Sequence, residues 1–526
     1  MRAGLDFCAD RVRTLMIGTF MIKRHGIGLA AATLASLLTS GCYSVGPDFT
    51  PPDPLLPRAS FFGKPEARSP EERAADAATT DPARAPADAA WWKTFHDSTL
   101  TSLVNRVADA NLDVATATLR LGESRDQRGV AASAALPSIN GNGSYQRELY
   151  SKNGVLSLAG PNLNIPPVSV WQTGFDASWE LDIWGHVRRQ VEAADAQVEM
   201  AEYQRRDVLV SAFAEVARDY VALRGAQAQI AIANDNLKSA SEILGLTRTR
   251  AAKGLTSGLD VENAAALVES IRAQLPSLEN EVDVDINAIS LILDEQPGAL
   301  KGELARVKPA APTPARAPLG IPSELARRRP DIRAAEAQLH AATANIGVAV
   351  ADFYPSVKLN GNIELNALSL KTLWKGSSLQ YMAGPAVELP IFEGGRLKST
   401  LQLRTSQEQE AAINYHKTVL QAWHDVINAF NAYGAEQRRR DSLKAEVDHS
   451  REALALSRTR YNNGVADFIT VLDAERTLLQ AEQQLAQSTT NVSTNLIQLY
   501  KALGGGWEST FPNEPPHPAE AALSLE

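Results

Sequence analysis

Side chains that could perform chemistry are few in this sequence, and they do not form a recognisable reactive site. The histidines lack metal-ligand spacing, and no G-x-S-x-G motif, paired cysteine and histidine, or phosphate-binding glycine loop occurs. The three glycines at 504–506 are better explained as a helix stop. We therefore expect neither an enzyme nor a bound metal or cofactor. The eight histidines are His25, His96, His186, His340, His416, His424, His449 and His517.

Cys42 carries the most specific chemistry in the sequence. A basic stretch after Met21 is followed by an apolar run at 26–38, too short to span a bilayer, and small residues precede the cysteine. This arrangement is similar to a bacterial lipobox, although Thr39 stands where leucine is usual. We expect a leader at 1–41, starting at Met1 or Met21, and a diacylglycerol and palmitate on Cys42. The alternative is a plain secretory leader.

A nine-residue pattern occurs twice. L-T-R-T-R-A-A-K-G at 246–254 recurs as L-S-R-T-R-Y-N-N-G at 456–464. At the same displacement, an apolar stripe with heptad spacing is also repeated upstream. Duplicated chains tend to build rings, so function is sought in an assembly. The stripes are Leu209, Phe213, Val216, Tyr220 and Leu223, and Val419, Trp423, Val426, Phe430 and Tyr433.

Composition excludes some classes of partner. The chain has 526 residues, 44% of them hydrophobic, and a net charge of −9. A negative chain lacks the basic face that nucleic-acid binding needs, so no nucleic acid is expected. After the leader no run of ~20 apolar residues occurs, and any membrane crossing would require strands.

Hydrophobic periodicity predicts the same element order in each half of the chain. In the first half we expect a helix at 97–136, strands at 138–149 and 168–181, a helix of about 100 Å at 185–250, and a returning helix at 259–293 kinked at Pro276. In the second half we expect a helix at 332–351, strands at 357–365 and 380–389 separated by a loop at 371–376, a long helix to 462, and a returning helix to 503.

These elements define a mixed α and β fold, mostly α and internally duplicated. The expected segments are the leader, a lipid anchor and proline- and alanine-rich strap, two repeats joined by a linker, and a disordered tail. Their bounds are 1–41, 42–90, 91–303, 304–322, 323–507 and 508–526, respectively.

The strands alternate apolar and polar residues, so each has one lipid-compatible face. Four such strands cannot close a barrel, and open edges are not tolerated in lipid, so several chains must pool their strands. The heptad stripes would then form a helical tube, and the sequence predicts a channel. A periplasmic coiled-coil adaptor is the structural alternative. Expected lumen residues are Asp176, Glu180, Lys358 and Glu364, and expected lipid-facing residues are Trp171, Phe175 and Trp179.

Several strings resemble the TolC-like outer-membrane efflux protein family, specifically its lipoprotein branch of the NodT or OprM type. They span residues 42–507 and include V-G-P-D-F, W-W-K-T-F-H-D, W-E-L-D-I-W-G-H-V-R-R, R-R-R-P-D-I-R-A-A-E, G-P-A-V-E-L-P-I-F-E-G-G-R and Y-K-A-L-G-G-G-W. The insertion before Trp91 is longer than usual for the family, which affects the strap alone.

The resemblance implies a homotrimer with a twelve-stranded barrel in the bacterial outer membrane and a helical tunnel in the periplasm. Such a protein is the exit duct of a tripartite efflux system. Its partners are outer-membrane lipid, a periplasmic adaptor (membrane fusion) protein and an inner-membrane pump, by default of the resistance-nodulation-division type. Export of small toxic compounds, and hence antibiotic resistance, is the expected function. Type I protein secretion or metal-ion export is the alternative.

The resemblance also implies that the hairpin tips gate the tunnel and dock the adaptor. The expected gate residues are Asp260, Arg460, Tyr461 and Asp473. Asp260 could instead be a helix N-cap. Thr470 and Ala466 stand where the TolC pattern has an acidic and a basic residue, so a different closing network is expected. Because the two tips differ in sequence, with Tyr461 and Asp473 only in the second, the second tip is expected to move more. The expected docking residues are Gly254, Leu255, Thr256, Ser257, Gly464, Val465, Ala466 and Asp467.

Overall fold

The computed structural model describes residues 44–55, 90–151, 166–307 and 328–511. The predicted leader and Cys42, and most of the predicted linker and tail, lie outside the described residues. The chain divides into two compact units. The strand unit comprises the described residues of 1–46, 137–188 and 350–391, and the helical unit comprises the remainder.

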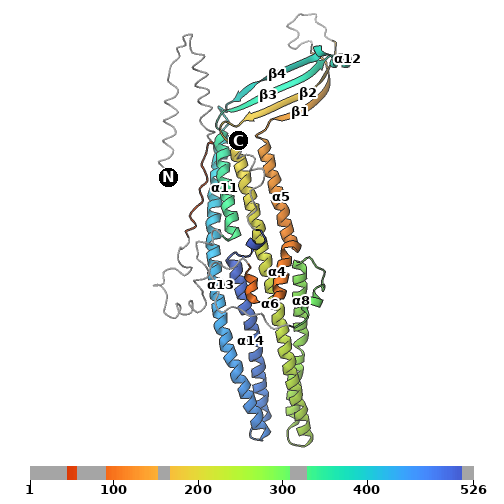
Figure 1. The fold of residues 1–526 in the computed structure, drawn as a ribbon, viewed down its shortest axis with the longest axis vertical. Helices are drawn as coiled ribbons and strands as arrows, with labels where there is room; N and C mark the ends of the chain where they lie inside the picture. The colour runs from red at the N-terminus through yellow and green to blue at the C-terminus, as the bar shows by residue number, and fades with distance from the viewer. Residues whose placement is uncertain (1–43, 56–89, 152–165, 308–327, 512–526) are drawn as a thin grey trace. The chain divides into compact units, whose positions relative to one another are not determined.

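The strand unit is a four-stranded antiparallel sheet in the order β1-β2-β3-β4 (Figure 1). The strands are β1 (Ser138–Glu148), β2 (Val168–Leu181), β3 (Ser356–Ala367) and β4 (Leu379–Glu388), which confirms the four predicted strands. The predicted loop between β3 and β4 instead contains two short helical turns, α12 (Leu370–Leu373) and η4 (Gly376–Ser378). Both edge strands belong to this one chain, one from each half.

The pairing register gives the sheet one polar and one apolar face. Glu180 lies directly opposite Lys358, and Oε2 and Nζ are 3.8 Å apart. Because opposite residues share a face and every second residue along a strand returns to it, the four predicted charges lie together. They are Asp176, Glu180, Lys358 and Glu364. The other face carries Trp171, Phe175 and Trp179, opposite Ala367, Ile363 and Leu359.

The first half of the helical unit starts with η2 (Trp91–Phe95), α4 (Ser98–Ala110) and α5 (Leu112–Ser133). We predicted one helix here, but Asn111 breaks it. Its carboxamide oxygen accepts hydrogen bonds from the backbone N–H groups of Asp113 and Val114, each 3.0 Å long, and its nitrogen donates to the Ile292 carbonyl at 2.9 Å. Asn111 therefore caps α5 and ties it to the returning helix.

The first hairpin consists of α6 (His186–Ala252), α7 (Gly258–Arg272) and α8 (Leu275–Ile292), followed by the short α9 (Lys301–Leu304). The predicted kink at Pro276 is a full break, and the proline lies in the first turn of α8. A proline there has no intrahelical N–H bond to lose, so a new helix start is the less costly arrangement.

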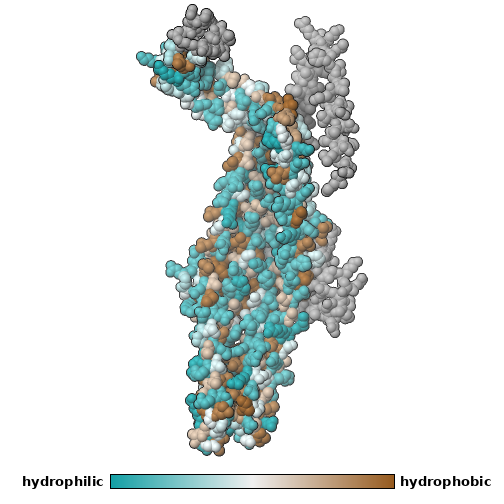
Figure 2. All heavy atoms as spheres, turned by 180° about the vertical axis from the view of Figure 1, so that it is seen from behind, coloured by the Kyte–Doolittle hydropathy of each residue, from teal (hydrophilic) through white to brown (hydrophobic). Residues whose placement is uncertain are grey.

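The second half repeats this order with α11 (Pro330–Ala351), α13 (Arg396–Asn462), α14 (Phe468–Ala502) and η5 (Trp507–Ser509). Helices α6 and α13 each have 67 residues, about 100 Å at ~1.5 Å per residue. Figure 2 shows apolar side chains scattered among polar ones over one face of this unit. No helix that the structure describes is both apolar and long enough to cross a bilayer.

Both predicted heptad stripes enter one hydrophobic core. Nine of their ten residues are buried, and Trp423 is partly buried against the same cluster. Trp91, Phe95 and Tyr500 belong to the same core, and the rings of Trp91 and Tyr500 stack with centroids 5.2 Å apart. The duplicated stripes thus form two equivalent helix faces that pack into one hydrophobic core.

The segments on either side of the helical core are more ordered than predicted. Gly504 has φ +70° and stops α14 as expected, but it also lies against Arg329, whose Cγ would be 2.5 Å from an added Cβ. We placed Glu508 in a disordered tail, whereas it forms an ion pair with Arg328 at 3.0 Å. Within the predicted strap, Asp48 forms an ion pair of 2.6 Å with Arg189, which ties this part of the strap to α6.

Candidate functional site: the hairpin tips and the seam between the hairpins

The two duplicated turns close their helices with the same hydrogen bonds. Leu255 N–H donates to the Arg250 carbonyl and Val465 N–H to the Arg460 carbonyl, both at 2.9 Å. Gly254 and Gly464 have φ values of +72° and +74°, a conformation that favours glycine. This 6→1 bond beside a left-handed glycine is a Schellman motif. The repeated sequence pattern therefore encodes a repeated cap, which leaves Leu255 and Val465 exposed at the ends of the hairpins.

The helices that leave the two turns start differently. Ser257 is the N-cap of α7, and Asp260 completes a capping box with it, while the Thr256 hydroxyl donates to Oδ2 of Asp260 at 2.5 Å. These hydrogen bonds, that from Thr256 foremost, hold the pKa of Asp260 below its usual value. Asp467 is the N-cap of α14 but makes no side-chain capping bond. Asp260 is thus at the third helical position rather than the N-cap, and the second turn is held by fewer bonds.

Near the tips, one side chain from each hairpin forms a direct contact. The guanidinium of Arg250 at the end of α6 lies over the ring of Tyr461 at the end of α13, 4.4 Å from its centroid. Arg250 Nη2 also donates to Asn462 Oδ1 at 3.4 Å. The Tyr461 hydroxyl is buried and has no hydrogen-bond partner among the described residues, so its ring alone carries the contact with Arg250.

Amide and carboxylate side chains join the hairpins further along. Asn236 Nδ2 on α6 donates to Glu482 Oε2 on α14 at 3.1 Å, and Gln229 Nε2 donates to Gln487 Oε1 at 3.0 Å. Gln483 Nε2 donates to the side chain of Gln274, beside α7, at 2.6 Å. We call this row of contacts, with that of Arg250 and Tyr461, the seam.

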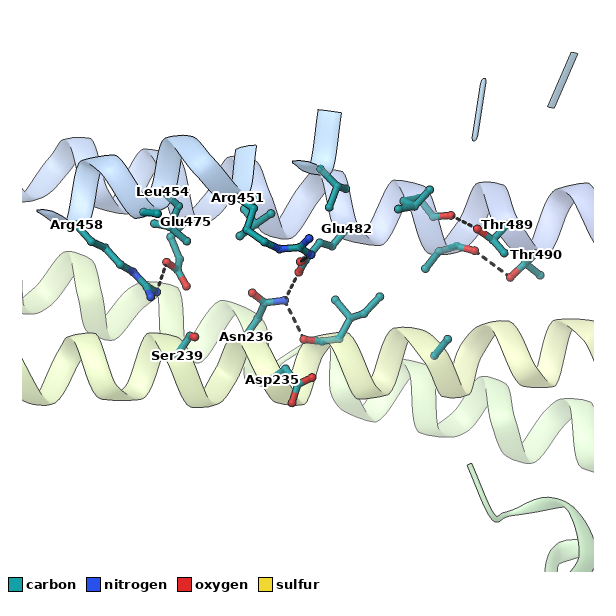
Figure 3. A pocket seen from close by; sticks show the side chains of 17 residues that line it. Asp235, Asn236, Ser239, Arg451, Leu454, Arg458, Glu475, Glu482, Thr489 and Thr490 are labelled. Carbon is teal, nitrogen blue, oxygen red and sulfur yellow. Dashed lines mark hydrogen bonds and ion pairs between the residues drawn. The ribbon is translucent and has the colours of Figure 1, made fainter. Parts of the chain in front are cut away.

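Beside the seam, α6 on one side and α13 with α14 on the other line a cavity of about 630 Å³ (Figure 3). Two ion pairs join α13 to α14 along it. Arg458 Nη2 lies 2.8 Å from Glu475 Oε2, and Arg451 Nη2 lies 2.8 Å from Glu482 Oε1. Glu475 is 3% exposed, so its pairing with Arg458 avoids an isolated buried charge. The α13–α14 hairpin is therefore internally tied, and few bonds cross the cavity to α6.

The hairpins approach closely at Gly225 and Thr490, and Thr490 also lines the cavity. A Cβ added to Gly225 on α6 would overlap the side chain of Thr490 on α14. Only a glycine allows this approach of the two helices. Gly225 and Thr490 thus form a close crossing point, beyond which the hairpins share the seam and a second apolar cluster that contains Leu244 of α6, Leu267 of α7 and Phe468 of α14.

Away from the seam, α6 and α8 bring three carboxylates near one another, those of Asp219, Glu281 and Asp285. Burial, with the nearby charges of Asp219 and Glu281, raises the pKa of Asp285 to about 7. Burial also raises the pKa of Asp219. One Asp285 oxygen is buried and has no hydrogen-bond partner among the described residues. The described residues contain no cluster of three or more His, Cys, Asp or Glu side chains able to hold a metal ion.

Among the contacts of the described residues, none joins two of the four predicted gate residues. Tyr461 contacts Arg250, whereas the Asp260 carboxylate accepts hydrogen bonds from Thr256 and Ser257 in its own turn. Arg460 and Asp473 are exposed, and neither forms an ion pair within the described part of the chain. Sequence reasoning missed Arg250, although it belongs to the repeated R-T-R pattern, because no local signal shows which side chains face the other hairpin.

A duplicated chain with a two-faced sheet, two long hairpins and matched tips defines the class of a channel-forming outer-membrane protein. A family model described as "Outer membrane efflux protein" matches residues 103–294 and 321–505. The chain is 31% identical over 483 residues to Nodulation protein T of Rhizobium leguminosarum bv. viciae, covering 92% of this chain and 94% of that protein.

Two further comparisons agree. A Toluene efflux pump outer membrane protein, TtgC of Pseudomonas putida, is 30% identical over 491 residues, covering 91% of this chain and 96% of that protein. The solved structure of the outer-membrane channel OprN has a TM-score of 0.79 and 33% identity, covering 88% of this chain and 99% of that chain. The chain belongs to the outer membrane efflux protein family, and it is an outer-membrane channel of an efflux system.

Proposed function

We propose that three copies of this chain close a twelve-stranded barrel and a continuous helical tunnel, and that the assembly conducts solutes without catalysing any reaction. The observation that carries this proposal is the two-faced sheet, whose edge strands β1 and β4 come from opposite halves of the chain. A sheet with one apolar face requires its edges to be paired in lipid. Pairing β1 of one copy with β4 of the next would meet that requirement.

The seam is the gate in this proposal. Closed hairpins are held by the contact of Arg250 with Tyr461, by the bond of Asn236 to Glu482, and by apolar packing of α6 and α7 against α14 around Phe468. Opening moves the α13–α14 hairpin away from α6 about the crossing of Gly225 and Thr490. The second tip moves more than the first, because its helix start lacks the side-chain cap that Ser257 supplies to the first.

The tips are the docking surface for a periplasmic adaptor. Two turns per chain with the same Schellman cap would present six similar sites around a trimer. Exposed apolar side chains at the turns, Leu255 at 72% and Val465 at 66%, offer contacts that the chain itself does not cover. An inner-membrane pump of the resistance-nodulation-division type, joined through that adaptor, would supply small toxic compounds as cargo.

A diacylglycerol and palmitate on Cys42 anchor the N-terminus in this proposal. The ion pair of Asp48 with Arg189 supports it, because it holds the chain six residues after the cysteine on the helical unit. Mass spectrometry of the mature N-terminus should give a triacylated cysteine. An unmodified Cys42 thiol, or a leader cut elsewhere, would contradict this anchor.

Function is tested by deleting the gene in its host and restoring it on a plasmid. Loss should increase sensitivity to dyes, detergents and antibiotics, and the intact gene should restore resistance. Unchanged sensitivity to all of these compounds, with the protein expressed in the parent strain, would contradict export of small toxic compounds.

A further inference from the structure

The connection between β3 and β4, residues 368–378, is a folded loop, which we call the distal loop. Leu373 is 4% exposed, and its side chain anchors the loop. Thr372 N–H donates to the Ser369 carbonyl at 3.0 Å, Lys375 N–H donates to the Thr372 carbonyl at 3.0 Å, and the Ser378 hydroxyl donates to that same carbonyl at 2.8 Å. These bonds fix which side chains point outward.

The outward side chains are apolar and basic together. Trp374 is 73% exposed, Leu368 and Leu370 are exposed, and Lys371 and Lys375 are exposed beside them. No aspartate or glutamate occurs between residues 366 and 387. An exposed tryptophan on a rigid loop is costly in water, and two lysines without a carboxylate leave the loop positive. The loop therefore suits a partner that is both apolar and anionic.

The position of the distal loop narrows the choice of partner. It joins two strands at the end of the sheet opposite the ends at which α6 and α13 follow β2 and β4. At this same end Arg147 of β1 is exposed, and the rings of Tyr145 and Trp171 pack with centroids 4.3 Å apart. In the proposed barrel, on which this inference rests, this end reaches the outer leaflet of the outer membrane.

We propose that the distal loop binds the phosphate groups of an outer-leaflet glycolipid. Lys371 and Lys375 hold the phosphates as point charges, and Trp374 enters the interface between headgroup and acyl chains. A lysine near an anionic lipid surface strengthens binding roughly fivefold. The two lysines together then contribute about 20–30-fold to the affinity for a phosphorylated lipid.

The test measures binding of fluorescent diphosphoryl lipid A to the detergent-purified protein. Lys371→Gln with Lys375→Gln should weaken binding about 20–30-fold, whereas removing two exposed lysines of α13, Lys417→Gln with Lys444→Gln, should leave it unchanged. Trp374→Ala should weaken binding of both diphosphoryl lipid A and a dephosphorylated analogue. Inorganic phosphate in large excess should compete only weakly.

Three results would overturn the inference. They are equal affinity of the distal-loop double variant and the parent protein, an equal loss in the α13 control, and complete competition by inorganic phosphate, which would indicate a free-phosphate site. Trimer mass and single-channel conductance are measured for each variant. If the parent protein shows no trimer mass or no single-channel conductance, the proposed channel is contradicted. If the distal-loop double variant conducts normally and its lipid binding is unchanged, only the distal-loop inference is contradicted.

Discussion

The contact of Arg250 with Tyr461 gives the sharpest prediction for the gate. The guanidinium lies 4.4 Å from the ring centroid, and the Tyr461 hydroxyl has no hydrogen-bond partner among the described residues. Tyr461→Ala and Arg250→Ala should therefore both open the channel, whereas Tyr461→Phe should remain closed, because it keeps the ring and loses only the unpartnered hydroxyl.

The expected magnitude follows from the exposure of the pair. Both side chains are half-buried, so water still reaches the pair, and we use the lower value of ~0.5–1 kcal/mol that applies to cation–π contacts that are not desolvated. If the three copies of a trimer release together, the closed state loses about 1.5–3 kcal/mol, which raises the ratio of open to closed channels about 10–150-fold. Arg250→Ala also removes the hydrogen bond from Arg250 to Asn462, but this loss adds little to the change in free energy, because the bond is long at 3.4 Å.

Single-channel recording in planar bilayers measures this ratio directly. Arg248→Ala is the matched control, since Arg248 is an exposed arginine on the same turn of α6 and makes no ion pair in the described structure. It should behave as the parent protein does. An open Tyr461→Phe channel would show that the hydroxyl closes the gate. A closed Arg250→Ala channel would show that the cation–π contact does not hold the gate closed.

Three other predictions concern the rest of the helical unit. Burial raises the folded-state pKa of Asp285 to about 7. The stability that its protonated form contributes is fully present below pH ~4 and is lost as the pH rises from there through 7. Asp285→Asn should remove this loss of stability, and a variant whose thermal midpoint depends on pH as that of the parent does would contradict this. Gly225→Ala should lower stability by ~1–3 kcal/mol in thermal unfolding, with partial recovery on adding Thr490→Ala, and no recovery would argue against their close approach. Ser257→Ala should speed hydrogen exchange at the start of α7, at a cost of ~1 kcal/mol, whereas Asp467→Ala should change exchange at the start of α14 little; equal effects would contradict the unequal caps.

Periodicity was sufficient to predict the strands and the long helices. Alternation in β2 places Trp179 and Glu180 on opposite faces whatever the partner strand is, and the register agrees. Heptad spacing likewise predicts burial of Phe213 and Val426, since it specifies one helix face. These features depend on local periods that tertiary contacts did not overrule.

Other features depend on partners that sequence does not show. Asn111 ends a helix because its side chain bonds both the next turn and the distant Ile292 carbonyl. Ser257 rather than Asp260 caps α7, although both residue types are common caps. The pairing of Arg250 with Tyr461 requires the relative rotation of two helices, which no local pattern encodes.

Disulfide cross-linking of the sheet edges tests the central claim most directly. Ser144→Cys in β1 is combined in one chain with a cysteine at one of three positions in β4, namely Gln380, Met382 or Gly384. Because β1 and β4 lie at opposite edges of the four-stranded sheet, a bond between them must join different chains. Oxidation in outer membranes should give a ladder that ends at three linked chains, while each single-cysteine control gives none. Monomers alone, or a ladder extending beyond three, would contradict a closed trimeric channel.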